Sequence, residues 1–335
     1  MPRLFHPRLI NDPFDDPGVF VPFLFEKKAI IFDLGDHTAL STRDVLKISH
    51  AFITHTHMDH FVGFDRLLRL LLGRDKTLYI YGPEGFLNNI EGKLSGYTWN
   101  LVEHYVNDFT LQATEINQAQ TSTRVYRCNN RFDPDPETRV IPFSGVLYKE
   151  PSFSVSTVLL DHQIPCLGYR LEENFHININ KESVEALGLE TGPWLNDFKQ
   201  ALYEKRNPDF LIQVPWGRKG KDNKKFRLGE LADRIAIYTP GQKIVYISDV
   251  GGSAENQEKL IEFAKDSDLL FIEAAFLDKH RDTAEKKYHL TARQAGETAK
   301  RAGVKNLVIF HFSPRYSGKG ELLKKEAMEA FRGHI

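Results

Sequence analysis

The residues best suited to chemistry form one short cluster, His55-Thr56-His57-Met58-Asp59-His60, directly after an apolar segment. We call it the His55–His60 cluster. In an extended or turning segment side chains alternate, so His55 and His57 point the same way and can share one metal ion. Asp59 and His60 lie further round the turn and face a second position. Because one zinc ion needs only about four imidazole or carboxylate ligands, the cluster predicts two ions completed by residues from elsewhere.

Three other apolar segments end in residues of the same ligand types. They are Val158 to His162, Val245 to Asp249 and Val308 to His311. A single histidine or aspartate in such a place is more often a core, rim or turn residue. Together with the His55–His60 cluster, however, these segments indicate ligands. Strands of one sheet deliver their carboxyl ends to one edge, so we expect all four ligand segments to meet at one sheet edge.

The elements that must position these residues follow an α/β pattern. Short runs rich in Val, Ile and Phe alternate with segments of helical period, which is typical of an α/β sandwich. The expected strands are 29–33, 51–54, 77–81, 153–160, 210–214, 243–248, 269–272 and 307–310. Apolar residues on one face predict a helix over 61–72. Thr291 and Gln294 have capping-box spacing, which predicts a second helix that Gly303 stops.

Residues 172–230 break this alternation, because glycines and prolines are scattered through them. We interpret this segment as an insertion carried by a single domain of 335 residues. It contains a run, 218–227, with six positive charges against one negative. Such a run is a candidate phosphate-binding patch, although it could also be a solvated loop. Its candidate substrate-binding residues are Lys219, Lys221, Lys224 and Lys225.

Composition excludes several classes of protein. Lys and Arg number 44 against 45 Asp and Glu, so no global basic field indicates nucleic acid, and phosphate binding requires a local patch. The two cysteines, Cys128 and Cys166, are too few for a disulfide framework. The first twenty residues have neither the apolar core of a signal peptide nor a membrane span, so we expect a cytoplasmic protein.

The His55–His60 cluster matches in full the HxHxDH signature of the metallo-β-lactamase superfamily, which the whole chain resembles. The resemblance implies an α/β fold, the αββα sandwich of that superfamily, here with an inserted arm at 172–230. It also implies two bound ions, zinc first, although manganese or iron can use similar ligands. By this resemblance one ion would be held by His55, His57 and His162 and the other by Asp59, His60 and His311, with Asp249 bridging them.

Within the superfamily, three stretches resemble the ribonuclease Z family: 161–170, 273–291 and 311–316. Glu273 and His289 match the acidic and histidine positions of that family's HEAT-type segment and HST-type loop. Other stretches depart from the family. Ser248-Asp249-Val250 replaces its GDT, Phe64 to Leu68 replaces its LPGLL, and Asn196 stands where its tRNA-clamping arm usually has a glycine. Residues 188–193 nevertheless resemble part of that arm.

The resemblance implies an endoribonuclease that cleaves precursor tRNA on its 3′ side and leaves a 3′-hydroxyl on the tRNA. Two ions about 3.5–4 Å apart can hold a bridging hydroxide that attacks the phosphorus. Asp59 would orient that nucleophile or take its proton. His289 would protonate the leaving oxygen, with Glu273 fixing its tautomer.

Further residues are candidates for substrate contacts. Arg315, four residues after His311, could reach a phosphate oxygen, although a surface salt bridge is an equal alternative. Ser313 lies in the same stretch.

Two other functions stay open. The chain could be a phosphodiesterase for small diesters or other RNA, or a metal-binding scaffold without catalysis. The scaffold is the weaker reading, because no expected ligand is substituted. A homodimer is implied by the resemblance.

Overall fold

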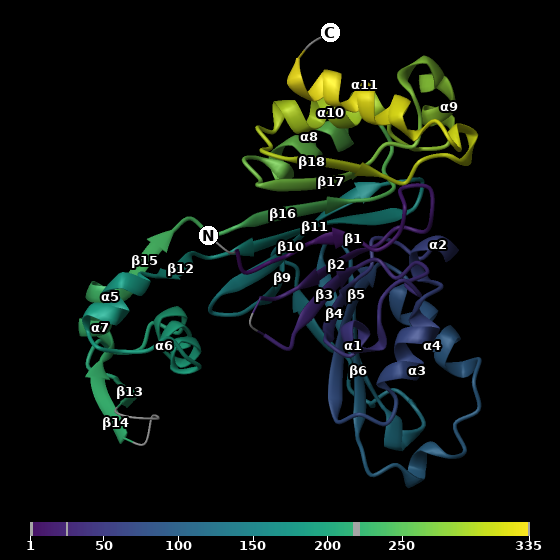
Figure 1. Ribbon diagram of the computed structural model, residues 1–335. Coiled ribbons are helices and arrows are strands. Elements are labelled where there is room, and N and C mark those ends of the chain that lie inside the picture. Colours follow the sequence, from purple (N-terminus) through teal and green to yellow (C-terminus); the bar gives the residue numbers. More distant parts are fainter. Residues whose placement is uncertain (1–2, 25, 217–221, 334–335) are drawn as a thin grey trace. The chain divides into compact units, whose positions relative to one another are not determined.

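The computed structural model describes residues 3–24, 26–216 and 222–333 (Figure 1). The chain forms two compact units. The smaller one consists mainly of Glu172–Gln242, with Tyr148–Ser154, and we call it the arm. The larger one, the body, is built from Phe5–Leu147, Val155–Leu171 and Lys243–Ile335. Every expected metal ligand belongs to the body.

In the described part of the body, eight strands form one sheet in sequence order. They are β1 (Arg8–Leu9), β2 (Val19–Pro22), β3 (Ala29–Phe32), β4 (Ile48–Phe52), β5 (Lys76–Pro83), β6 (Phe109–Ile116), β7 (Gln120–Arg127) and β8 (Arg139–Pro142). β3 to β6 run parallel, and the outer strands are antiparallel. The helices α1 (Thr42–Val45), α3 (Phe64–Leu71) and α4 (Phe86–Ser95) bury their apolar residues against this sheet. A parallel sheet buried on both faces explains why strands such as Ala29–Phe32 are entirely apolar.

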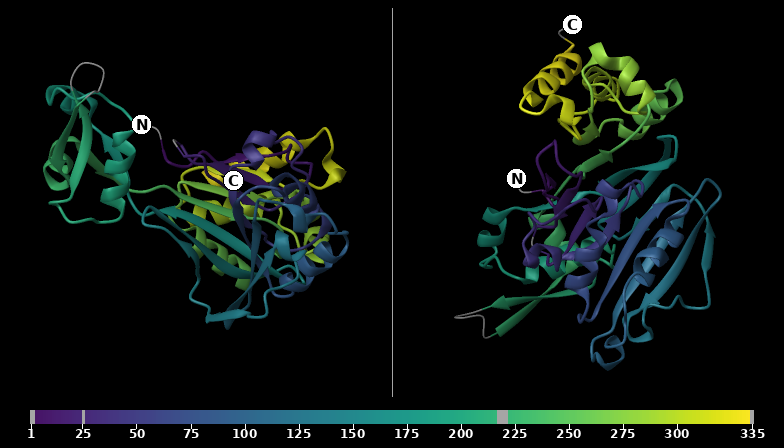
Figure 2. Two further views of the ribbon diagram at one scale, coloured as in Figure 1. Left: turned by 90° about the horizontal axis from the view of Figure 1, so that it is seen from below. Right: turned by 90° about the vertical axis from the view of Figure 1, so that its right-hand side faces the viewer.

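A second sheet has the order β18-β17-β16-β11-β10-β9 among the described residues. Its strands are β9 (Val146–Lys149), β10 (Phe153–Asp161), β11 (Pro165–Glu173), β16 (Lys243–Ile247), β17 (Leu269–Glu273) and β18 (Leu307–Phe310). The helices α8 (Ala254–Ala264), α10 (Ala292–Arg301) and α11 (Gly320–Arg332) cover its outer face (Figure 2).

Aromatic side chains fill the space between the two sheets. The Phe32 ring of the first sheet stacks on Tyr169 and Tyr246 of the second, with ring centroids 5.8 and 5.5 Å apart. Phe52 lies 5.4 Å from the same Tyr169 ring. The layers therefore run helix, sheet, sheet, helix, which confirms the expected αββα sandwich.

The arm has a small core of its own. Its helices are α5 (Lys181–Ala186), α6 (Trp194–Tyr203) and α7 (Leu228–Ile235), and its strands are β12 (His176–Ile179), β13 (Leu211–Trp216), β14 (Asp222–Arg227) and β15 (Ala236–Thr239). β12 pairs with β15, and β13 pairs with β14, both antiparallel. Buried side chains such as Phe198, Val214 and Leu231 hold these elements together.

Most expected elements of the body are present, and the main corrections concern their grouping. The eight expected strands lie within one to three residues of their predicted bounds, and Thr291 and Gln294 form a complete capping box on α10. The expectation of one sheet carrying all ligand segments is wrong, because β4 belongs to the first sheet while β10, β16 and β18 belong to the second. The strand prediction also omitted the long strands β6, β7 and β11 and the strands β1, β2, β8, β9, β12, β14 and β15.

The helix expected over 61–72 is in fact two helices. α2 (Met58–Phe61) ends before Gly63, and α3 begins at Phe64. A Cβ atom at Gly63 would lie 2.3 Å from the Gly35 carbonyl oxygen and 2.4 Å from His37 Nδ1. The break therefore results from a close tertiary approach, which the periodicity of the segment does not reveal.

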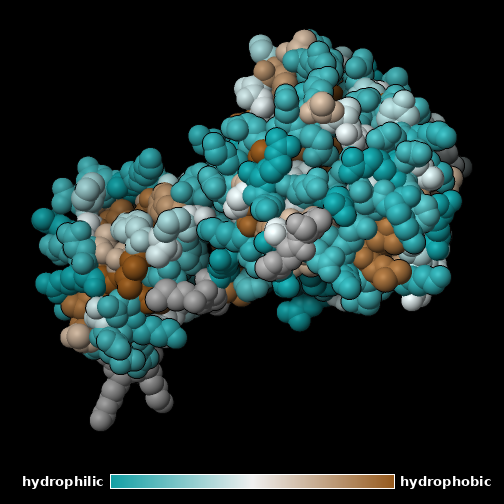
Figure 3. Space-filling model, turned by 90° about the horizontal axis from the view of Figure 1, so that it is seen from above, coloured by the Kyte–Doolittle hydropathy of each residue, from teal (hydrophilic) through white to brown (hydrophobic). Residues whose placement is uncertain are grey.

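Neither cysteine forms a disulfide, since Cys128 and Cys166 are both free and buried. Within the described ranges, no helix is both long enough and apolar enough to cross a bilayer. Figure 3 shows a largely hydrophilic face in which apolar residues are scattered, as is normal for a protein surface.

The packing of α10 on α11 yields a stability prediction. A Cβ atom at Gly296 would lie 2.2 Å from the Ala327 carbonyl oxygen, whereas one at Gly92 in α4 meets no atom within 4 Å. Overpacking makes Gly296→Ala destabilising by roughly 1–3 kcal/mol, which lowers the thermal unfolding midpoint by about 1–4 °C. Gly92→Ala, the matched control, should leave the midpoint equal or slightly raised, because alanine favours the helix. Equal midpoints for both variants in differential scanning calorimetry would disprove the close contact.

Candidate metal centre

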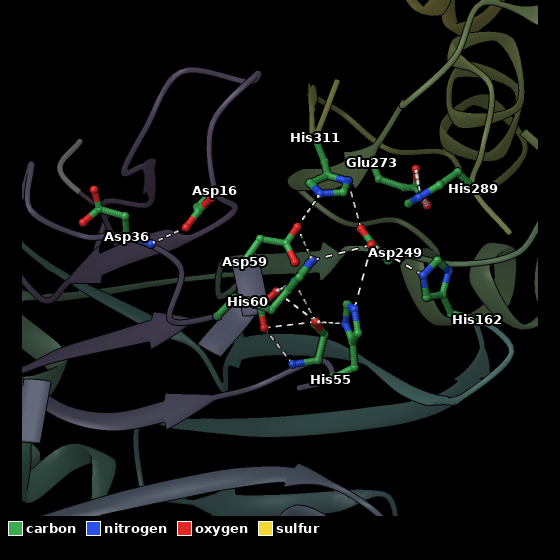
Figure 4. A network of polar contacts seen from close by, with 12 residues as sticks. Asp16, Asp36, His55, Asp59, His60, His162, Asp249, Glu273, His289 and His311 are labelled. Carbon is green, nitrogen blue, oxygen red and sulfur yellow. Dashed lines mark hydrogen bonds and ion pairs between the residues drawn. The ribbon is translucent and has the colours of Figure 1, made fainter. Parts of the chain in front are cut away.

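Four segments that follow strands bring the expected ligands to one place (Figure 4). The His55–His60 cluster follows β4, and His162 lies between β10 and β11. Asp249 follows β16, and His311 follows β18. The site thus lies where the ends of both sheets meet, so each sheet contributes part of the ligand set.

The ligand atoms fall into overlapping groups of metal-binding size. The first group is His55, His57, His162 and Asp249; the second is Asp59, His60 and His311; a third, Asp249, His289 and His311, shares residues with both; within each, the ligand atoms lie within 4.8 Å of one another. The Asp249 carboxylate, a member of the first group, also faces the second. Its Oδ2 is 3.8 Å from His55 Nε2, 3.5 Å from His60 Nε2 and 3.6 Å from His162 Nε2. Its Oδ1 is 2.9 Å from His311 Nδ1. This arrangement suits one carboxylate that serves two ions.

The protonation pattern of the histidines fits metal binding. His60 Nδ1 is 3.0 Å from Asp33 Oδ2, and His162 Nδ1 is 2.7 Å from the Tyr288 carbonyl oxygen. These contacts hold a proton on Nδ1, so that Nε2 faces Asp249 and can offer its lone pair to a metal ion once it carries no proton. His55 Nε2 and His60 Nε2 are buried and have no hydrogen-bond partner. Buried polar atoms without partners are rare in native proteins, and a metal ion would satisfy both.

Electrostatics at the site are dominated by the carboxylates among the histidines. Burial alone would raise the pKa of Asp249, but His311 and His60 beside it hold that pKa well below its usual value. Burial would lower the pKa of His60, but Asp249 and Asp33 raise it to about 10. By contrast, burial lowers the pKa of His55 to about 2. Protons on some histidines thus balance the carboxylates, and divalent ions can replace them.

Asp33, which directly follows β3, supports this site, although it was not among the residues predicted to act there. Its side chain is fully buried and accepts hydrogen bonds from the Thr54 backbone at 2.7 Å and from the Tyr246 hydroxyl at 2.8 Å. It also holds His60, as described above. The signal was present in the sequence: a lone charged residue ends the apolar run Ala29–Phe32. A charge in such a position requires partners.

Glu273 and His289 lie beside the ligands. Both carboxylate oxygens of Glu273 are 3.1 Å from His289 Nδ1, and one also accepts the Val250 N–H at 2.8 Å. The His289 ring lies 5.0 Å from the His162 ring and 5.6 Å from the His311 ring. Burial would lower the pKa of His289, but the charge and hydrogen bond of Glu273, together with the charge of Asp249, raise it. The structure therefore brings together the two residues that the sequence paired.

The candidate substrate-binding residues are more dispersed. A cavity of about 400 Å³ opens on the ligands and is lined by His57, Asp249 and His289 among others, but by neither Ser313 nor Arg315. Arg315 is exposed on a short turn, Pro314–Tyr316. Lys224 and Lys225 belong to β14 of the arm. Lys219 and Lys221 lie outside the described residues, so all these contacts remain predictions.

Comparison with known proteins places the chain in a family. Residues 227–312 match the beta-lactamase superfamily domain. Ribonuclease Z of Thermococcus sibiricus is 30% identical over 294 residues, which cover 86% of this chain and 78% of that protein. The chain belongs to the ribonuclease Z family. As a member of that family it is a metal-dependent nuclease of the hydrolase class, with a His/Asp cluster that can hold metal ions.

Solved structures agree on the fold of this ribonuclease Z family member. The metallo-β-lactamase fold protein YhfI of Bacillus subtilis aligns with a TM-score of 0.53 at 15% identity. The alignment covers 95% of this chain and 86% of YhfI. The short form of human tRNase Z has a TM-score of 0.52 at 19% identity and covers 93% of both chains.

Asp33 gives a test of the centre that does not depend on activity. Asp33→Ala leaves the Thr54 N–H, the Tyr246 hydroxyl and His60 Nδ1 without their acceptor. We expect it to cost about 3–5 kcal/mol of unfolding free energy in urea and to weaken metal binding about 10–100-fold in chelator competition. Tyr246→Phe, the control, removes one hydrogen bond to Asp33 and should cost only about 2 kcal/mol with wild-type metal affinity. Wild-type metal affinity in Asp33→Ala would contradict this support role.

Proposed function

We propose that this chain is an endoribonuclease that cleaves precursor tRNA on its 3′ side and leaves a 3′-hydroxyl on the tRNA. The observation that carries the proposal is the Glu273–His289 pair beside a seven-residue ligand set. The names of its relatives, ribonuclease Z and tRNase Z, support the choice of substrate. The proposal includes two zinc ions and a cytoplasmic homodimer in which the arm of one subunit holds tRNA cut by the other.

In this proposal each ion has its own ligands. His55, His57 and His162 would hold one ion, Asp59, His60 and His311 would hold the other, and Asp249 would serve both. When bound, such a pair supplies Lewis-acid chemistry, namely activation of a water nucleophile and neutralisation of charge on the phosphoryl group. The remaining steps belong to side chains of this chain.

Asp59 is the candidate proton acceptor. It is the most exposed carboxylate among the ligands, with 43% of its side-chain surface accessible. Its Oδ2 lies 3.5 Å from His60 Nε2 and 3.3 Å from His311 Nε2, which leaves its other oxygen available to the cavity that it lines. A carboxylate in this position can orient an attacking water molecule and take its proton.

His289 is the candidate proton donor to the leaving oxygen. Its Nδ1–H donates to Glu273, so its Nε2 is directed toward the cavity that His289 lines. A protonated histidine just before the N-terminus of α10 is disfavoured by the helix dipole. The buried Glu273 carboxylate compensates for this effect and favours the protonated ring.

Replacing Glu273 should change the pH dependence of cleavage. Glu273→Gln can keep the Val250 hydrogen bond through its amide oxygen, but it removes the negative charge that raises the pKa of His289. That pKa then falls, so the protonated donor is lost at a lower pH and the alkaline limb of the kcat/KM profile moves to lower pH. We expect a loss of about 10–100-fold on the alkaline side and a smaller loss in acid.

The control for this experiment is Glu91→Gln, which alters a carboxylate paired with Arg124 and Tyr126 in the body, away from the ligands. It should leave the shape of the pH profile unchanged. A Glu273→Gln profile identical to that of the wild type would remove His289 from the role of acid.

The arm offers two basic residues on one exposed strand face. In the β13–β14 hairpin, Lys225 pairs with Gln213 and Arg227 pairs with Leu211. These side chains are all exposed, and residues two apart on a strand share a face. Lys224 points to the other face, where its Nζ lies 4.6 Å from the Trp216 ring centroid and 5.0 Å from that of Phe226. We therefore assign tRNA phosphate contacts to Lys225 and Arg227 rather than to Lys224.

This assignment gives the decisive test of substrate class. The wild-type protein should cleave precursor tRNA, and the double variant Lys225→Gln/Arg227→Gln should lose affinity for it. Because two phosphate contacts disappear, the slope of log kcat/KM against log salt should decrease by about two. Turnover of bis-(p-nitrophenyl) phosphate, which has no second phosphate for these residues to contact, should not change. Lys224→Gln is the matched control and should keep the wild-type salt slope.

Turnover of the small diester without cleavage of precursor tRNA would exclude the proposed substrate.

A further inference from the structure

One cation that lines the cavity beside the ligands has no role in the proposed mechanism. Among the described residues that line it, Lys287 is the only lysine or arginine. Its side chain is exposed, and in the described ranges no ion pair engages it. Lys286, its neighbour, is equally exposed but does not line the cavity. A polyanionic substrate bound in this cavity would therefore find Lys287 as the cation among its described lining residues.

The position of Lys287 is fixed by the turn that ends α9 (Arg281–Lys286). The His289 N–H donates to the Ala284 carbonyl at 2.9 Å, and the Tyr288 N–H donates to the Glu285 carbonyl at 3.1 Å. Tyr288 has a φ of +57°, so these bonds form a Schellman motif with tyrosine in the left-handed position. The turn is also anchored at the site, since the Tyr288 carbonyl accepts from His162 and the His289 ring contacts Glu273. Lys287 is thus placed by the same backbone that places His289.

We propose that Lys287 binds the phosphate immediately 5′ of the scissile one. This inference rests on the proposed function, because it uses the polarity of the cut. His289 protonates the 3′ oxygen that stays on the tRNA. The nucleotide that carries this oxygen carries the next phosphate on its 5′ side. Because Lys287 stands two residues from His289 in the same turn and lines the same cavity, we assign its ammonium to that side of the cut, where it provides a charge-assisted contact to the phosphate.

The experiment removes the contact first by replacing Lys287 and then by removing the charge of the phosphate. A precursor tRNA is assembled from two strands, so that the 3′ strand can be synthetic and carry a neutral methylphosphonate at the position 5′ to the scissile phosphate. The intact and modified substrates are each cleaved by the wild type, Lys287→Gln, Lys287→Arg and the control Lys286→Gln. The measured quantity is kcat/KM.

The expected pattern is a coupled loss. With the intact substrate, Lys287→Gln should reduce kcat/KM roughly three- to tenfold, whereas Lys287→Arg should recover most of it and Lys286→Gln should match the wild type. With the methylphosphonate substrate, the wild type should fall to the level of Lys287→Gln, and Lys287→Gln should fall no further. Turnover of bis-(p-nitrophenyl) phosphate, which lacks the second phosphate, should be unchanged in Lys287→Gln.

Two results would overturn the assignment. One is wild-type kinetics in Lys287→Gln. The other is an equal loss in Lys287→Gln on both RNA substrates, which would mean that Lys287 acts without this phosphate. Failure of the wild type to cleave intact precursor tRNA is a different outcome, because it removes the proposed function itself and the ground for this assignment with it.

Discussion

The buried carboxylate of Asp33 is the interaction on which the body depends. It accepts hydrogen bonds from the Thr54 backbone after β4 and from the Tyr246 hydroxyl of β16, and it contacts His60 of the metal centre. One side chain therefore joins the first sheet, the second sheet and the ligand cluster. Removing a carboxylate from water costs several kcal/mol unless donors surround it, so the three partners must be in place together. This requirement couples correct packing of the sheets to a correctly oriented ligand.

The same coupling explains how ligands far apart in sequence become neighbours. His55 and His311 come from different sheets, and neither sheet alone could gather the set. The aromatic layer of Phe32, Tyr169 and Tyr246 sets the separation of the sheets, and Asp33 fixes their alignment at the end where the strands stop. Rigid strands then position ligands more precisely than long loops could.

The sequence predicted what depends on local pattern and missed what depends on tertiary approach. The His55–His60 cluster, the strand-end residues Asp249 and His311, and the capping box at Thr291 could be recognised because each has a short spacing rule. The break at Gly63 could not, since it arises from the Gly35 carbonyl, which is remote in sequence. The division into two sheets was missed because apolar runs look alike in either sheet. Lys287 was not singled out in the sequence because exposure and the direction of a turn are not encoded in residue type, and the Arg315 contact stays a prediction.

Part of the backbone strain lies at the metal centre. Four of the eight described non-glycine residues with positive φ lie in or beside the site, namely Asp33, Gln163, Tyr288 and His311, at φ values of 55°, 60°, 57° and 59°. Glycine would adopt these conformations without cost, but it could not supply a carboxylate at 33 or an imidazole at 311. Each such residue costs of order 1 kcal/mol and persists only when its surroundings hold it. At Asp33 three hydrogen-bonding partners do so, and at Tyr288 the Schellman bonds and His162 do so. Where the residue after a strand must direct its side chain into the site, its backbone is strained. The contacts of that same side chain offset the cost.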